Sequence, residues 1–120
     1  MEEIKLGVVE SRFADIIWKN EPIHSRELAR LCEQELNWKR PTTYTVLRKL
    51  CERGLFQNLN GIVSAVISKQ EFHAMQSEKF VEDTFAGSLP AFLSAFASRK
   101  SLTAEEIAQI RQMIDSYEEG

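Results

Sequence analysis

One fifteen-residue segment, 39–53, concentrates the side chains that can bind nucleic acid. It holds five basic residues against the single carboxylate of Glu52. Its hydroxyl groups can donate to phosphate oxygens, a threonine can contact thymine methyl groups, and an arginine can contact guanine or phosphate. We therefore predict double-stranded DNA as a partner. The candidate DNA-binding residues are Lys39, Arg40, Thr42, Thr43, Tyr44, Thr45, Arg48, Lys49 and Arg53.

The net charge of the whole chain argues against DNA binding. The formal net charge is −3, and residues 68–120 hold five basic residues against nine acidic ones. A local patch, and not the whole-chain charge, sets the potential that a phosphate group meets. An ordinary solvated helix face would have the same basic composition as residues 39–53. The neighbouring elements therefore have to decide between the two interpretations.

The rest of the sequence offers no other chemistry. His24 and His73 have no nucleophile motif near them, and Cys32 and Cys51 have no third or fourth ligand that would complete a metal site. Both cysteines lie in amphipathic patterns, which is typical of reduced, buried thiols. The apolar runs are too short for a membrane helix. We predict a cytoplasmic protein that is not an enzyme, takes no cofactor or metal, and does not insert into membranes.

Helical periodicity predicts two helices before the basic segment. The first runs over residues 8–19, and the second starts at Ser25, which we expect to be its N-cap, and reaches about residue 36. The predicted inward face of the first helix consists of Val9, Phe13, Ile16 and Ile17.

The basic segment itself is predicted to be a third helix, followed by a hairpin. The helix should begin near Pro41, because proline is tolerated in a first turn, and end near Arg53, before Gly54. Two β-prone runs then flank Asn60-Gly61, a dipeptide that favours the positive φ angles of a tight hairpin turn. Three helices and a hairpin in this order indicate a winged helix, with the third helix as its recognition helix.

After residue 67 the pattern is helical again, with three amphipathic helices. Capping-box sequences, Ser68 with Glu71 and Thr103 with Glu106, open the first and the last of them. The arm holds five phenylalanines, including Phe72, and is too thin to bury so many rings alone. A second copy of the chain would bury them, so we expect a homodimer; folding back onto the same chain is the alternative. The candidate dimerisation residues are Phe85, Leu89, Phe92, Leu93, Phe96, Ile107, Ile110, Ile114 and Tyr117.

The predicted fold class is mainly α with a small β-hairpin. Residues 1–67 should form a winged helix-turn-helix domain that binds DNA. Residues 68–120 should form a helical dimerisation arm that presents two recognition helices to one site.

The arrangement of several residues resembles the penicillinase-repressor family, which includes the methicillin-resistance and copper-operon repressors. The residues that carry the resemblance are Ile17-Trp18-Lys19, Trp38, Thr42, Thr45, Leu47, Leu50, Gly54-Leu55, Gly61, Leu102 and Glu105-Glu106. The resemblance covers essentially the whole chain. It implies a winged helix, C-terminal helices that interlock as a homodimer, and repression by occupying an inverted-repeat operator.

The sequence departs from this family in the wing. The family carries a basic residue before the turn, then Gly-Arg, and a late aromatic; here the positions are Leu59, Gly61-Ile62 and Val66. The wing therefore lacks a phosphate anchor, and losing such a contact flattens the salt dependence of DNA binding. The alternative function is a winged-helix protein-interaction module with weak or no operator binding.

The resemblance also suggests how a repressor of this kind is released. The β-lactam repressors are cut at an Asn-Phe bond by a membrane-bound metalloprotease sensor. The matching bond here joins Ala95 and Phe96, which makes it the candidate cleavage bond and a sensor protease a candidate partner. The copper branch uses paired C-terminal cysteines, whereas this chain has none after Cys51. The resemblance therefore implies no direct copper sensing.

Overall fold

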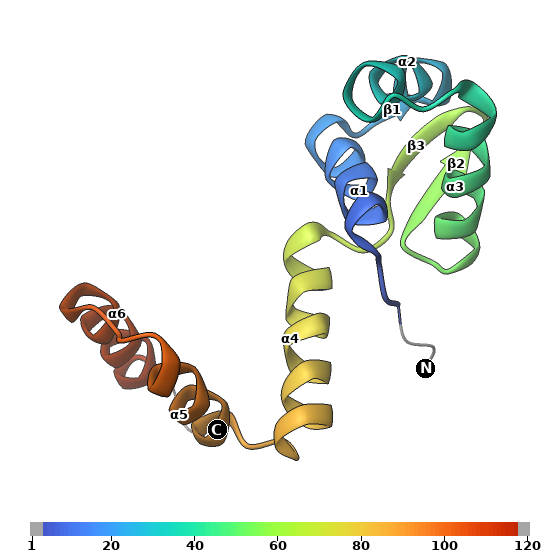
Figure 1. Ribbon diagram of the computed structural model, residues 1–120. Helices are drawn as coiled ribbons and strands as arrows, with labels where there is room; N and C mark the ends of the chain where they lie inside the picture. The colour runs from blue at the N-terminus through green and yellow to red at the C-terminus, as the bar shows by residue number, and fades with distance from the viewer. Residues whose placement is uncertain (1–3, 118–120) are drawn as a thin grey trace. The chain divides into compact units, whose positions relative to one another are not determined.

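The computed structural model describes residues 4–117, and within them the chain is mainly helical with one small antiparallel sheet (Figure 1). This confirms the predicted fold class. The elements, in chain order, are α1 (Val8–Asn20), β1 (Ile23–His24), α2 (Ser25–Leu36), α3 (Arg40–Glu52), β2 (Phe56–Leu59), β3 (Ile62–Ala65), α4 (Lys69–Phe85), α5 (Leu89–Arg99) and α6 (Ala104–Asp115).

Contacts divide the chain into two compact units, one ending at Met75 and the other beginning at Gln76. The division falls inside α4, so the first turns of that helix pack with the first unit. The functional division that the sequence suggests, into a DNA-binding and a dimerisation domain, stays a prediction.

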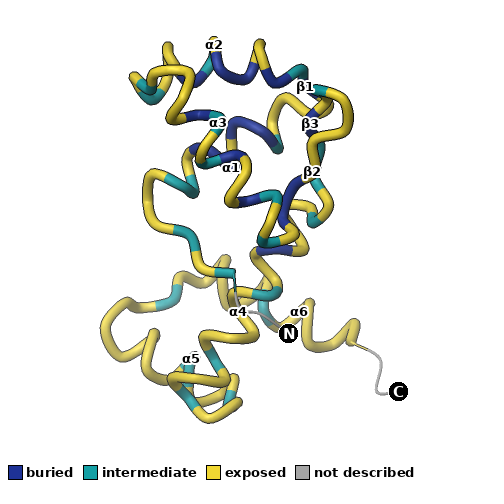
Figure 2. The backbone as a smooth tube through the Cα atoms, turned by 90° about the vertical axis from the view of Figure 1, so that its right-hand side faces the viewer, coloured by how far each residue is buried: buried dark blue, intermediate teal, exposed yellow. Residues whose placement is uncertain are grey.

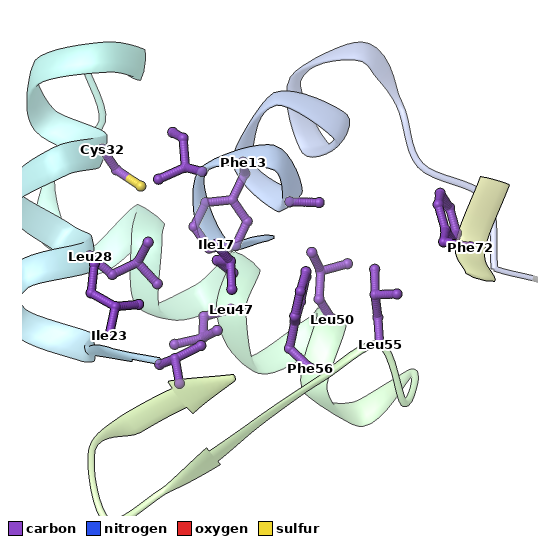
Figure 3. Packing of buried hydrophobic residues seen from close by; sticks show 13 residues of the cluster. Phe13, Ile17, Ile23, Leu28, Cys32, Leu47, Leu50, Leu55, Phe56 and Phe72 are labelled. Atoms are coloured by element: carbon purple, nitrogen blue, oxygen red, sulfur yellow. The ribbon is translucent and has the colours of Figure 1, made fainter. Parts of the chain in front are cut away.

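The first unit is a winged helix around one hydrophobic core. Helix α1 packs against β3, α3 packs against β2, and α2 contacts both α1 and α3. Figure 3 shows the apolar side chains that meet between these elements. The buried core consists of Phe13, Ala14, Ile16, Ile17, Ile23, Leu28, Cys32, Leu47, Leu50, Leu55, Phe56, Val63 and Phe72. Of the residues predicted to face inward from α1, Val9 is the exception, because 48% of its surface is exposed.

The sheet has a third strand that the sequence analysis missed. Strand β1 has only two residues, too few to show an alternating pattern, and it pairs antiparallel with β3, so the strand order is β1-β3-β2. The predicted hairpin is confirmed, with Asn60 and Gly61 at φ angles of 54° and 88°. The N-cap of α2 is His24 and not Ser25: the His24 ring accepts the backbone N–H of Arg26.

The start of α4 belongs to the core of the first unit. Phe72 is buried, and its ring lies 5.7 Å from the ring of Trp18, which also contacts Phe56. The Trp18 indole N–H donates to the backbone oxygen of Ile67 at 3.0 Å. Phe72 was predicted to belong to the arm, and the structure corrects this assignment.

The second unit contains the rest of α4 together with α5 and α6. Ser88 caps α5, and Thr103 with Glu106 forms the predicted capping box of α6. No residue from Gln76 to Tyr117 is buried, and Figure 2 accordingly colours this stretch as exposed (yellow) or intermediate (teal). None of the helices within residues 4–117 is long and apolar enough to span a membrane.

Candidate nucleic-acid interface

Helix α3 packs into the winged helix with one face and exposes its other face to solvent. Leu47 and Leu50 are buried against the core, and Val46 is half-buried. Pro41 lies in the first turn, where its missing N–H costs no helical hydrogen bond. Gly54, at a φ of 85°, follows the end of the helix. These local features leave the opposite face of α3 exposed to solvent.

Six of the nine predicted DNA-binding residues are exposed. They are Lys39, Arg40, Thr42, Thr45, Arg48 and Lys49. Three- and four-residue spacing places Thr42, Thr45 and Lys49 on one side of the helix, with Arg48 beside them. This surface combines two hydroxyls with positive charge along one helix, as the recognition helix of a helix-turn-helix protein does. We call these six residues the α3 surface.

Two of the predicted residues, Tyr44 and Arg53, are partly withdrawn from solvent. The guanidinium of Arg53 donates to the backbone oxygen of Lys5 at 2.9 Å, which ties the N-terminal segment to the end of α3. Arg53 is half-buried, and so is Tyr44. Neither side chain is as available to DNA as the sequence suggested.

Thr43 is the clear departure from the prediction. Its side chain is completely buried, so its hydroxyl cannot reach a base or a phosphate. Among the described residues, Thr43 Oγ1 is the buried side-chain polar atom that has no hydrogen-bond partner. Its polar neighbour is the Cys32 thiol of α2, and burial raises the pKa of that thiol to about 11, with the Thr43 hydroxyl lowering it in part. The contact between α2 and α3 therefore contains a neutral thiol and a hydroxyl.

An ion pair restrains the N-terminal end of the α3 surface. Arg40 Nε lies 3.3 Å from Glu33 Oε1 of α2, and both side chains are about half exposed. Exposed pairs of this kind contribute little stability, so the arginine can exchange the carboxylate for a phosphate at small cost. In the free protein, Glu33 lowers the positive charge that Arg40 presents.

The wing contributes no charge to this interface. Residues 56–65 contain no charged side chain. Beside the turn, Leu59 and Ile62 face each other across the hairpin, and their side chains are 61% and 43% exposed. Cationic contacts to the phosphate backbone would have to come from the helices.

Sequence reasoning missed two residues at the start of α2. Arg26 is exposed in the first turn, and His24 lies between this turn and the wing. Their role depends on the pairing of β1 with β3, and a strand of two residues leaves no sequence pattern.

The predicted dimerisation residues form two apolar groups in the second unit. Phe85, Phe92 and Phe96 of the predicted set make a chain of ring contacts with Phe80 of α4, which was not in that set. The ring centroids in contact lie 5.7–6.2 Å apart. Ile107 and Ile114 of α6, and Tyr117 just after it, are exposed by 37%, 63% and 78%. Together with Ile110 we call these residues the α6 stripe. The other members of the predicted set are Leu89, which is exposed, and Leu93 and Ile110, which are half-buried.

The candidate cleavage bond lies inside α5. Ala95 and Phe96 are both exposed, and the Ser98 hydroxyl donates to the Ala95 backbone oxygen at 2.7 Å. A protease that binds an extended substrate would have to unwind this helix locally.

No three His, Cys, Asp or Glu side chains come together between residues 4 and 117 in a way that could hold a metal ion. Cys32 and Cys51 are free thiols.

Comparison with known proteins identifies related sequences. A family model described as "Penicillinase repressor" matches residues 6–116. A penicillinase repressor from Bacillus licheniformis is 22% identical over 117 residues, which cover 94% of this chain and 91% of that protein.

Proposed function

This chain belongs to the penicillinase repressor family, which is a family of transcriptional repressors and not of enzymes, and on that basis we propose how it works. It acts as a homodimer that occupies an inverted-repeat operator through α3. The observation that carries the proposal is the α3 surface, where six exposed polar or basic residues lie opposite a buried apolar face.

Base contacts and phosphate contacts are expected from different parts of this surface. Thr42 and Thr45 are short enough to let the helix approach base edges, and their methyl groups fit against thymine methyls. Arg48 and Lys49 lie one to two turns further along, where they can neutralise phosphates on either side of the groove. Arg40 reaches guanine or phosphate once it leaves Glu33.

The dimer is supported by the apolar surface of the second unit. None of the residues 76–117 is buried, so the exposed phenylalanine rings and the α6 stripe of the second unit are in contact with water, which monomeric proteins avoid over large areas. A two-fold dimer would cover both groups and carry two copies of α3 to the two halves of a palindromic site.

DNA binding can be tested with the DNA immediately upstream of the gene. We expect fluorescence anisotropy to show binding that weakens steeply with salt and is lost in the double variant Arg40→Ala/Lys49→Ala. Arg111→Ala is the matched control, because it removes an exposed arginine from α6 and not from α3. Binding that is insensitive to salt, or equal loss in the double variant and the control, would refute the role of α3.

Release from the operator is proposed to follow proteolysis in the arm, at the bond between Ala95 and Phe96. Cutting there would separate the end of α5 and all of α6, with its apolar stripe, from the winged helix. Mass spectrometry of the chain co-expressed with a membrane-bound sensor protease should detect a fragment that ends at Ala95. A different cut site, or none, would leave the releasing signal to be sought elsewhere.

The neutral wing favours one alternative function, a protein-interaction module that kept the winged fold. Exposed Leu59 and Ile62 would suit a protein partner better than a phosphate backbone. An affinity for DNA no better than roughly 10⁻⁴ M at physiological salt, together with tight binding to a protein, would favour this alternative.

A further inference from the structure

The wing turn is docked onto the first turn of α2. The register pairs His24 with Ile62, and the backbone N–H of Ser25 donates to the Gly61 oxygen at 2.7 Å. The Gly61 N–H is itself bound by the Asn58 side chain at 2.9 Å. The Gly61 N–H is therefore bonded within the hairpin, and the Gly61 carbonyl joins the turn to α2.

The imidazole of His24 fills the space between these two turns. Its Nδ1 accepts the Arg26 backbone N–H at 3.1 Å, which caps α2. Its other side lies against Gly61, so closely that a Cβ at that position would be 2.9 Å from Nε2. One ring thus caps the helix with one nitrogen and packs against the wing with the other.

The hydrogen bonds within the protein occupy backbone N–H groups at the start of α2 that could otherwise bind a phosphate. The amides of Ser25 and Arg26 both have partners within the protein and are not free for a phosphate. The hairpin has four residues in each strand and carries no charge, and the Gly61 carbonyl at its turn is bonded to the Ser25 N–H at the start of α2.

We infer that His24 is a positioning residue that locks the wing turn to α2, so that the wing braces the helix-turn-helix instead of contacting phosphates. This inference rests on the proposed DNA binding for its functional consequence. It explains how a repressor can tolerate a wing that has lost its basic residues. The wing then acts through the orientation of α2, which packs against α3.

The first test separates the cap from the wing contact. His24→Asn can still accept the Arg26 N–H, because asparagine is a good N-cap, but its shorter side chain does not cover Gly61. Amide hydrogen exchange should show Arg26 protected as in the wild type and Ser25 exchanging faster. His24→Ala should expose both amides. Unchanged protection of Ser25 in both variants would overturn the inference, whether or not the protein binds DNA.

The second test uses a double-mutant cycle on DNA affinity. Gly61→Ala should weaken binding more in the wild type than in the His24→Asn background, where the clash with the ring is absent. The expected coupling is roughly three- to tenfold in Kd, typical of residues in direct contact. The strain of a side chain at a φ of 88° is common to both backgrounds and cancels. Additive effects would overturn the inference.

The salt dependence of binding distinguishes a brace from a phosphate contact. His24→Asn should lower the affinity without changing the slope of log K against log salt, whereas Arg48→Ala should reduce the slope by about 0.9. A comparable loss of slope in His24→Asn would overturn the brace, because His24 would then itself contact a phosphate. If the wild type shows no salt-sensitive binding, the proposed function fails, and the exchange at Ser25 still decides whether His24 fixes the wing.

Discussion

At the scale of single residues, the difference between Thr42 and Thr43 shows how one position along a helix separates two roles. Both are threonines in the first turns of α3, but Thr42 is exposed and Thr43 is completely buried. A buried hydroxyl whose polar neighbour is a thiol has lost its water and gained only a weak hydrogen-bond partner in exchange. The Thr43 hydroxyl is therefore poorly compensated at the contact between α2 and α3.

Thr43→Val should raise the free energy of unfolding by about 1 kcal/mol, because valine fills nearly the same volume without a polar atom. Chemical denaturation measures the change, and DNA affinity should stay at the wild-type value. Thr42→Val is the control, since an exposed hydroxyl has water as a partner and its replacement should not stabilise the fold. Weaker DNA binding by Thr43→Val with an intact fold would mean that this hydroxyl does reach the DNA.

At the scale of elements, α4 connects the two units and begins inside the first one. Its N-terminal turns place Phe72 against Trp18 and Phe56, and the Trp18 indole is held by the backbone of Ile67. Packing of Phe72 thus makes the first turns of α4 part of the core of the first unit.

Phe72→Ala should lower the free energy of unfolding of the first unit by about 3–5 kcal/mol, as expected for a buried phenylalanine. Tryptophan fluorescence in a denaturation series reports this directly, because both tryptophans, Trp18 and Trp38, pack against the core of the first unit. Phe80→Ala is the matched comparison: that ring is 51% exposed and lies in the second unit, so the fluorescence transition should shift little. Equal shifts in the two variants would argue against Phe72 as part of the core.

At the scale of the whole molecule, the two units differ in what they can bury. The first has a continuous core, whereas no described residue after Met75 is buried. The second unit nevertheless has well-capped helices and a cluster of phenylalanine rings. A unit without a buried core is stable when another surface covers its apolar side chains. We propose that a second copy of the chain provides this surface.

Ile114→Asp should convert the dimer into monomers. Ile114 is 63% exposed in the single chain, so the substitution should leave the protomer folded, but a charge buried in the dimer without a partner costs several kcal/mol. Sedimentation velocity measures the change. Gln109→Asp adds the same charge at an exposed polar position of α6 and should remain dimeric. Dimers in both variants would exclude the α6 stripe from the interface.

The sequence by itself determined the elements that depend on local chemistry. Capping residues, Pro41, Gly54 and the Asn60-Gly61 turn set where the helices and the hairpin begin and end, because these residues act on the backbone within a few positions. The basic composition of α3 and the apolar stripe of α6 can also be read directly from the sequence. The sequence also led to the family to which the chain belongs.

Only the tertiary structure decided which residues share a surface. Strand β1 exists because β3 lies beside it, and His24 becomes a contact of the wing only through that pairing. The packing of α3 buries Thr43 and leaves Thr42 exposed, and Phe72 packs into the core of the winged helix although it was predicted to belong to the arm. These outcomes depend on contacts between residues far apart in the chain, which periodicity within one segment does not encode.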